Sequence, residues 1–292
     1  AYITKWKIIM KDIISFQGEP GSYSHEACLE LSPKSEIMPC STFESAIDSV
    51  VQGLSKYALL PVENSTYGRV ADIHSLLPNS GLYIVKEHFL RIRIDLLGLK
   101  GSKLKDINRA MSHTVLLGQC REFLRNNKIT GVTGLDTAGS AKKISSQLDQ
   151  SFGALASALA GKIYGLETLA SGIEDMTNNT TRFLLMAPEP INDSAVTGDE
   201  FMTTIVFQVR NIPAALYKAL GGFATNGINM LKLESYMVGG SFTATQFYLD
   251  VEGHPENKHL KNAIEELAYF TSTCSILGVY EKHPFRSRSE KI

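Results

Sequence analysis

A short proline-rich stretch divides this chain of 292 residues into two unequal parts. Residues 187–194 combine two prolines with several turn-forming residues, which is typical of a linker. After it, residues 201–280 show the order strand, helix, strand, strand, helix, strand, with a hairpin turn expected at Gly239 and Gly240. That order is the ferredoxin-like βαββαβ unit, whose exposed sheet edge commonly pairs with another copy. We expect an amino-terminal region at 12–187, a linker at 188–200, a ferredoxin-like domain at 201–280 and a tail at 281–292.

Strand and helix patterns alternate in the amino-terminal region, which indicates an α/β fold. The apolar strand 57–62 has the composition of a strand buried on both faces. Extended residues 82–99 would suit a crossing between two lobes. Helices are expected after the capping-box sequence Ser41 to Glu44, at 116–124, at 138–148 with Thr137 as the cap, and at 154–164.

Two polar clusters lie at the ends of expected strands. Residues 63–69 follow the strand 57–62, and residues 178–182 precede an apolar strand at 183–186. In open α/β sheets ligands bind at strand ends of this kind. Thr181 offers a hydroxyl that both donates and accepts, and Arg182 a planar charge suited to a carboxylate. The alternative is that Thr181 only begins a strand and that Arg182 is a solvated charge.

The glycine-rich turn at 18–22 joins a strand at 13–17 to a helix that Ser22 or Ser24 could cap. Amides at such a helix start attract anions, so the turn either binds a carboxylate or is purely structural. Its spacing matches neither common nucleotide-phosphate loop.

Composition narrows the classes of partner. The formal net charge of -1 gives no reason to expect nucleic acid. No apolar run approaches the roughly 18 residues of a membrane span, and the amino terminus is too weakly apolar for a secretory signal. The four cysteines are scattered and lack the spacing of a zinc site. We expect a cytoplasmic protein that binds a small molecule, without a metal or other cofactor.

Four motifs resemble those of prephenate dehydratase in order and spacing. They are Gly18–Ala27, Pro61–Gly68, Ser112–Cys120 and Asn179–Leu184, and residues 201–280 resemble the ACT regulatory domain of that family. The resemblance implies a two-lobed catalytic region like a periplasmic binding protein. Lobe one would be about 12–88 and 170–187, and lobe two about 89–169.

The resemblance also implies site residues. The catalytic group would be Thr181, Asn64, Ser112 and Gln119, with Glu63 as a further candidate acid if burial raises its pKa. Substrate-binding residues would be Arg182, Phe183, Ser22, Tyr23, Ser24 and Thr66. His25 and His113 lie in the motifs as alternative acids or as structural residues.

The implied reaction takes prephenate to phenylpyruvate with loss of water and carbon dioxide, as part of phenylalanine biosynthesis. The implied effector is phenylalanine, bound in a homodimer or homotetramer. Its expected contacts are Asn211, Ala214, Ala215, Leu216, Asn229, Leu233, Glu234 and Ser235. Ala214 stands where the family commonly has glycine, Tyr236 and Met237 replace an Arg-Pro pair, and Thr114 and Val115 replace a Pro-Gln pair. A non-catalytic amino-acid sensor or solute-binding protein is the alternative.

Overall fold

The computed structural model describes residues 12–191, 200–238 and 244–289. The chain forms two compact units: the first holds residues up to Gly68 and Leu90–Thr181, and the second holds Arg69–Phe89 and the chain from Arg182 onward. The chain passes between them within β4 (Gly68–Arg69), β5 (Tyr83–Arg91) and β11 (Thr180–Ala187). The units therefore divide the chain at other positions than the expected lobes and linker, and those boundaries stay predictions.

One sheet of the first unit is parallel, in the order β2 (Glu36–Cys40), β1 (Ile13–Gln17), β3 (Tyr57–Asn64). Helices α1 (Tyr23–Leu31) and α2 (Phe43–Val51) pack against β1. The capping box of α2 is formed by Thr42 and Ser45, one residue later than expected. Because β1 and β3 are parallel, the glycine turn and the polar cluster after Val62 leave the sheet at the same edge.

A second sheet in this unit has the order β10, β6, β9, β7, β8 and mixes parallel and antiparallel pairs. Its buried core includes Leu97, Met111 and Ile144. The strands are β6 (Asp95–Gly98), β7 (Arg109–Ser112), β8 (Thr130–Thr133), β9 (Phe152–Ala156) and β10 (Glu167–Ala170), and the helices are α4 (Thr114–Gln119), α5 (Arg121–Asn126), α6 (Thr137–Ser145) and α7 (Ala158–Tyr164).

Four expectations for this region are wrong. The helix expected at 154–164 begins as strand β9, because Ala154 is completely buried beside β6 and burial overrides the helix propensity of alanine. Helix α6 is capped by Asp136 rather than by Thr137. The helix expected at 116–124 is broken at Cys120 into α4 and α5, and the extended segment 82–99 consists of two separate strands, β5 and β6.

The second unit contains the expected ferredoxin-like order, which is confirmed. Its strands β12 (Phe201–Val209), β13 (Met230–Met237), β14 (Ala244–Glu252) and β15 (Thr271–Glu281) alternate with α8 (Ala215–Thr225) and α9 (Lys258–Phe270) in the order βαββαβ. The antiparallel sheet runs β13, β14, β12, β15, and β15 also pairs with β5. The expected turn at Gly239 and Gly240 lies outside the described residues.

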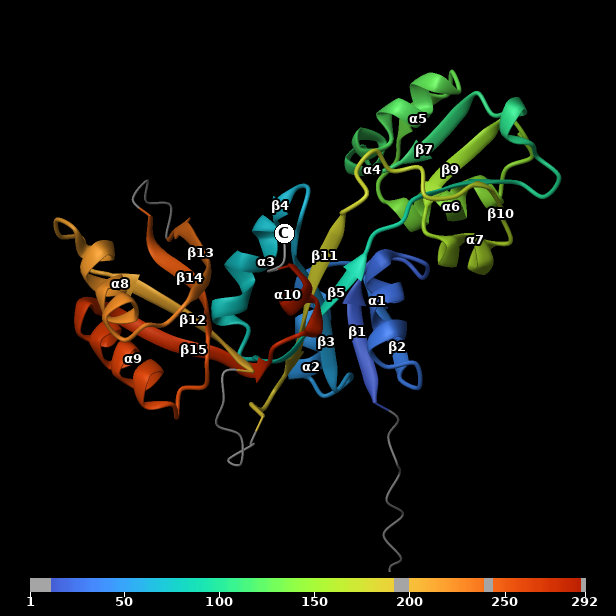
Figure 1. The fold of residues 1–292 in the computed structure, drawn as a ribbon. Helices are drawn as coiled ribbons and strands as arrows, with labels where there is room; N and C mark the ends of the chain where they lie inside the picture. Colours follow the sequence, from blue (N-terminus) through green and yellow to red (C-terminus); the bar gives the residue numbers. More distant parts are fainter. Residues whose placement is uncertain (1–11, 192–199, 239–243, 290–292) are drawn as a thin grey trace, which may run out of the picture. The chain divides into compact units, whose positions relative to one another are not determined.

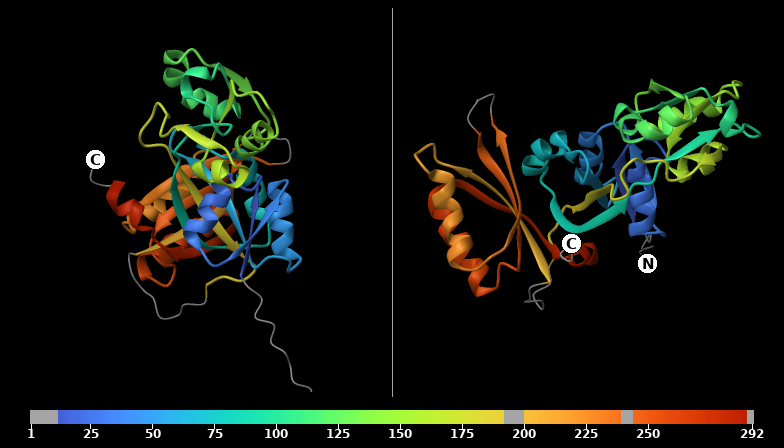
Figure 2. Two further views of the ribbon diagram at one scale, coloured as in Figure 1. Left: turned by 90° about the vertical axis from the view of Figure 1, so that its right-hand side faces the viewer. Right: turned by 45° about the horizontal axis from the view of Figure 1, so that its top comes forward.

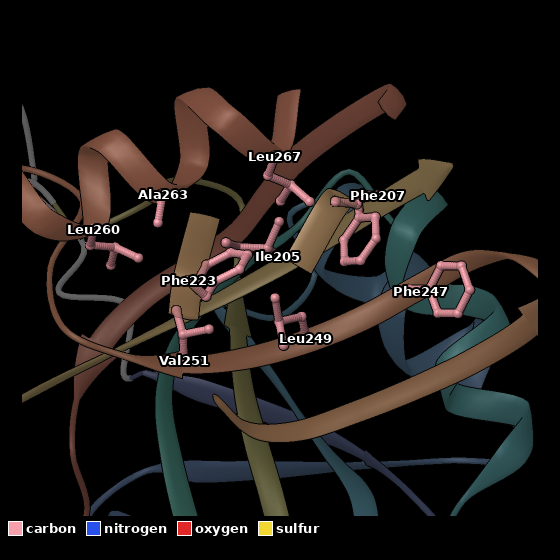
Figure 3. Packing of buried hydrophobic residues seen from close by; sticks show 10 residues of the cluster. Ile205, Phe207, Phe223, Phe247, Leu249, Val251, Leu260, Ala263 and Leu267 are labelled. Carbon is pink, nitrogen blue, oxygen red and sulfur yellow. The ribbon is translucent and has the colours of Figure 1, made fainter. Parts of the chain in front are cut away.

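Helices α8 and α9 cover one face of this sheet, as two different views show (Figures 1 and 2). Apolar side chains from both helices and from β12 and β14 fill the space between them, among them Phe207, Phe223, Leu249 and Leu267 (Figure 3). Each buried side chain of this size contributes about 1.5–3 kcal/mol by leaving water. The same unit holds β4 from Arg69, α3 (Ala71–Leu76) and the terminal α10 (Pro284–Ser289).

Candidate functional site

The expected pairing of Asn64 with Thr181 is present in the first unit. The side-chain amide Nδ2 of Asn64, at the end of β3, donates to Thr181 Oγ1 at 2.9 Å. The two residues are 117 positions apart in the sequence. Both are partly exposed, so a ligand can reach them.

Backbone contacts determine which way the Asn64 amide points. Its Oδ1 accepts from the amides of Thr66 at 2.9 Å and Tyr67 at 3.0 Å, and only an oxygen can accept there. The nitrogen must therefore face Thr181. Because Thr181 Oγ1 receives a hydrogen bond, the proton of its own hydroxyl is available to donate to another molecule. Thr66, which was expected to bind substrate, is exposed, and its backbone amide is one of the two donors to Asn64 Oδ1.

Asn179 is a member of the site that sequence reasoning did not single out, although it lies in the last motif. Its Oδ1 accepts a second hydrogen bond from Asn64 Nδ2 at 2.7 Å. Asn179 is 1% exposed, and its own Nδ2 is buried without a hydrogen-bond partner among the described residues. Its carbonyl accepts from Arg91 Nη1 and from the Ile92 amide, which hold the segment before Thr181 in place.

Gln119 lies at the end of α4 and is 7% exposed. Its Oε1 is buried with no hydrogen-bond partner in the described part of the chain. Its carbonyl accepts from the amide of Asp175 at 2.7 Å, and the Asp175 carboxylate in turn accepts from the first amides of α5. Gln119 is thereby tied to the segment that leads to Thr181, and its unpaired oxygen is free to accept from a ligand or water. A direct role in the reaction stays a prediction.

Ser112 does not offer its hydroxyl proton to a ligand. The residue is completely buried at the end of β7, and its Oγ donates to the carbonyl of Leu155 at 2.7 Å. This contact joins β7 to β9 in the sheet core. The structure therefore corrects the expectation that Ser112 contacts substrate and makes it a residue that shapes the strand end.

The glycine turn after β1 has the geometry of the structural alternative. The amides of Gly18, Gly21 and Ser22 bond to Cys40 O, His25 Nδ1 and Glu19 O. Gly21 has φ +92°, and a Cβ there would lie 2.8 Å from the Cα of Ala160, so only glycine fits. The turn is also held by Ser157 Oγ, which donates to the carbonyl of Gly21.

The first helix uses its expected ligand residues for its own structure. Ser22 Oγ caps α1 by accepting from the amide of His25, and Ser24 is buried. Tyr23 donates its hydroxyl to the carbonyl of Arg93 at 2.9 Å. Burial lowers the pKa of His25, and its ring stacks on Phe16.

Both histidines of the motifs have structural contacts. With Nδ1 accepting from the Gly21 amide, the neutral His25 ring carries its proton on Nε2. His113 Nδ1 caps α4 by accepting from the Val115 amide at 3.3 Å. The structural interpretation is favoured for both.

Two carboxyl groups near α1 have raised pKa values that the sequence did not indicate. Burial raises the pKa of Glu26, and the negative charges of Glu30 and Asp95 raise it further. Burial likewise raises the pKa of Asp95, although hydrogen bonds from Gly172, Ser171 and Thr168 partly oppose this. Glu63 is half-buried on β3 directly before Asn64, and its role as an acid stays a prediction.

Arg182 contradicts its expected role as a surface charge or a substrate ligand. The residue is 1% exposed and its guanidinium belongs to the second unit, where it pairs with Glu87 at 2.9 Å and Asp250 at 2.6 Å. The sequence could not show this, because both partners are far away along the chain. Phe183 is also buried, with 1% exposure, so it packs in the interior instead of contacting substrate.

The expected effector residues all lie in the second unit. Asn211, Ile212 and Ala214 are exposed before α8, while Leu216 packs against the helix-sheet core. On β13, Leu233 is exposed, and Arg69 Nη1 donates to Glu234 Oε2 and Ser235 O. Asn229 Nδ2 donates to Glu252, and Ala215 is the buried first residue of α8. Phenylalanine binding by these residues stays a prediction.

Within the described residues, no three His, Cys, Asp or Glu side chains are placed to bind a metal ion. The four cysteines are free, and burial raises the pKa of Cys28 to about 12, so this thiol is a poor nucleophile. None of the helices in the described part of the chain is both long and apolar enough to span a membrane.

Comparison with known proteins assigns the family. The model of the prephenate dehydratase family matches residues 14–191 of this chain. A bifunctional N-acyl-homoserine lactone acylase/prephenate dehydratase of Komagataeibacter europaeus is 48% identical over 276 residues, which cover 94% of this chain and 98% of that protein. The chloroplastic arogenate dehydratase/prephenate dehydratase 1 of Arabidopsis thaliana is 39% identical over 281 residues, covering 91% of this chain and 71% of that protein.

Two solved structures are similar to this chain over most of its length. A protein described as a novel type of quorum quenching acylase has 48% identity and a TM-score of 0.88, covering 94% of this chain and 99% of that one. The prephenate dehydratase of Arthrobacter aurescens in complex with L-Phe has 25% identity and a TM-score of 0.83, covering 92% and 90%. The resemblance carried by the four motifs is thus confirmed, and this chain belongs to the prephenate dehydratase family of lyases.

Proposed function

We propose that this dehydratase converts prephenate to phenylpyruvate, with Thr181 assisting departure of the ring hydroxyl. The observation that carries the proposal is the hydrogen bond from Asn64 to Thr181, which leaves the threonine proton directed away from Asn64 and available to the substrate. Family membership supports an enzyme over the alternative of a non-catalytic binding protein.

The reaction needs little more than orientation and one hydrogen-bond donor. The bond between the ring and its carboxylate breaks, carbon dioxide leaves, and the electron pair aromatises the ring while expelling the hydroxyl from the opposite carbon. A proton converts the departing hydroxide to water. Assistance of this kind contributes typically 10² to 10⁴-fold, and orientation supplies much of the rest.

The test is a comparison of Thr181→Ala with Thr181→Ser. Because serine keeps the hydroxyl, we expect kcat to fall about 10²-fold or more in the alanine variant and far less in the serine variant, with KM nearly unchanged in both. The ultraviolet absorbance of phenylpyruvate measures turnover. Thr177→Ala, an exposed threonine of the preceding turn, is the matched control. Turnover by Thr181→Ala equal to that of the wild type would remove Thr181 from this role.

The substrate could also be arogenate, the amino counterpart of prephenate, because relatives are named for both activities. Only the side-chain keto or amino group differs between the two substrates. Parallel kcat/KM measurements on both compounds distinguish them, and we expect prephenate to be preferred. A higher value for arogenate would change the substrate while keeping the reaction class.

We also propose that phenylalanine regulates the enzyme through the ferredoxin-like domain in a homodimer or homotetramer. Support comes from the relative solved with L-Phe and from the contacts of Arg69 with Glu234 and Ser235, two of the expected effector residues. Arg69 lies five residues after Asn64 along the chain. An effector that moves β13 would therefore move Arg69 and, through this short segment of the chain, Asn64. Activity should fall with millimolar L-phenylalanine and not with D-phenylalanine. Equal activity with and without L-phenylalanine would refute regulation alone.

A second candidate activity is hydrolysis of the amide bond of N-acyl-homoserine lactones. It is favoured by the 48% identity, over nearly the full length of both chains, to a relative named for this activity. Water would cleave the amide to a fatty acid and homoserine lactone, which mass spectrometry detects. If Thr181→Ala abolishes the dehydratase reaction and leaves the acylase reaction, two separate sites are present.

A further inference from the structure

Arg182, the residue directly after Thr181, forms hydrogen bonds with three buried side chains. Arg182 Nε donates to Glu87 Oε2 at 2.9 Å, Nη1 to Asp250 Oδ2 at 2.6 Å, and Nη2 to the hydroxyl of Tyr280 at 2.8 Å. Three different nitrogens bind three different residues, so both the position and the rotation of the planar guanidinium are determined.

The partners of Arg182 are themselves held. Thr204 Oγ1 donates to Asp250 Oδ1 at 2.6 Å and lies 2.8 Å from the hydroxyl of Tyr280. Glu87 also accepts from Arg286 Nε at 2.7 Å and Nη2 at 2.8 Å. Two carboxylates and two guanidinium groups balance each other, which buried charges require. We call Arg182, Asp250, Thr204, Tyr280 and Glu87 the arginine clamp.

The clamp also acts on the neighbouring threonine through strand geometry. Thr181 and Arg182 are consecutive residues of β11, and consecutive side chains of a strand point to opposite faces. Holding Arg182 on one face therefore holds the Cα–Cβ bond of Thr181 toward the other. On that other face Asn64 holds the hydroxyl.

We infer that Arg182 is a positioning residue for Thr181, and that the ferredoxin-like domain supplies its support through Asp250 on β14, Thr204 on β12 and Tyr280 on β15. This inference rests on the proposed role of Thr181. It gives the ferredoxin-like domain a part in catalysis even without an effector. Burial alone does not explain the residue, because an apolar side chain fills such a position without the cost of desolvating a charge.

Two adjacent buried threonines of β12 provide the test. Thr204 bonds to Asp250, whereas Thr203 donates to the carbonyl of Gly253 at 2.7 Å, and both side chains are fully buried. Valine has the shape of threonine without its hydroxyl. We expect Thr204→Val to lower kcat about fivefold with KM changed less than about twofold, Thr204→Ser to restore kcat, and Thr203→Val to leave it unchanged.

A second pair of variants tests the positioning role of Arg182 through another of its partners, Tyr280. Tyr280→Phe removes one hydrogen bond to Arg182, and Tyr269→Phe, which removes the hydroxyl of an exposed residue on α9, is the matched control. We expect kcat to fall only in Tyr280→Phe. If both Thr204→Val and Tyr280→Phe fold and keep the wild-type kcat, Arg182 has no positioning role.

Hydrogen exchange makes the test independent of turnover. In the full-length protein, amides of the segment around Thr180 and Thr181 should exchange faster in Thr204→Val than in Thr203→Val or the wild type. Unchanged exchange in Thr204→Val overturns the inference even if the enzyme is active. Faster exchange in Thr204→Val, found together with a wild-type protein that does not turn over prephenate, would support the clamp and refute the proposed function.

Discussion

At the scale of single residues, the orientation of one amide decides what Thr181 can do. The side chain of Asn64 accepts from two backbone amides through Oδ1 and donates to Asn179 and Thr181 through Nδ2. Both polar atoms of the amide group are therefore hydrogen-bonded. The carbonyl of Asn179 accepts from Arg91 Nη1 and from the Ile92 amide, which hold the backbone that carries its side chain. We therefore regard Asn179 as the support of Asn64.

Removing the Asn179 side chain tests this support. In Asn179→Ala the Asn64 amide loses one acceptor and can rotate, so we expect kcat for prephenate to fall about tenfold, the effect of one hydrogen bond. The neighbouring Asn178→Ala is the control, because Asn178 is exposed and its carbonyl, not its side chain, accepts from Ser65 and Thr180. Equal losses in both variants would contradict the assignment.

At the scale of elements, helix α8 begins on a strained residue. Ala214, the N-cap of α8, has φ +58° and ψ +25°, a left-handed conformation that favours glycine. The left-handed conformation of Ala214 therefore costs free energy, which the packing of the helix against the sheet offsets.

Ala214→Gly should relieve this strain. We expect the free energy of unfolding to rise by about 0.5–1 kcal/mol, because relief of the left-handed strain exceeds the added entropy of the unfolded chain. Urea unfolding measures the change. The same substitution at Ala224, an exposed helical residue of α8, should lower the free energy of unfolding by up to about 1 kcal/mol. Two changes of the same sign would show that Ala214 is not strained.

At the scale of the whole molecule, Glu87 joins segments that are far apart along the chain. Burial alone would raise its pKa, but hydrogen bonds from Arg286 and the positive charge of Arg182 outweigh burial and hold the pKa below its usual range. The unfolded chain therefore binds a proton to this carboxyl at a higher pH than the folded protein does. The stability from Glu87 is present above the ordinary glutamate pKa and is lost as the pH falls through the lower, folded value.

This sign leads to a pH prediction. We expect the wild-type melting temperature to fall as the pH decreases below about 4.5, and Glu87→Gln to show a shallower fall over the same range while being less stable at pH 7. Glu256→Gln, which changes an exposed carboxylate, should follow the wild type. Parallel curves for Glu87→Gln and the wild type would mean that Glu87 does not contribute to the acid sensitivity.

Features that depend on neighbouring residues could be predicted from the amino-acid sequence. Hydrophobic periodicity and turn residues specified the βαββαβ order after residue 200, because strand and helix periods are local properties. The motifs around Asn64 and Thr181 identified the family and the pair that the structure joins at 2.9 Å. The contact between Asn64 and Thr181 could therefore be anticipated from the motifs, whereas their role in the reaction stays a prediction.

The environment of each side chain depends on contacts that form when the chain folds. An arginine such as Arg182 can contact a substrate carboxylate or two buried carboxylates, and the choice depends on Glu87 and Asp250, which no local pattern connects to it. Ser112 became a core residue, and residues 154–156 became a strand, for the same reason. Desolvation and hydrogen-bond pairing are set by groups that folding brings together, so their outcome is absent from the local sequence and appears only in the folded chain.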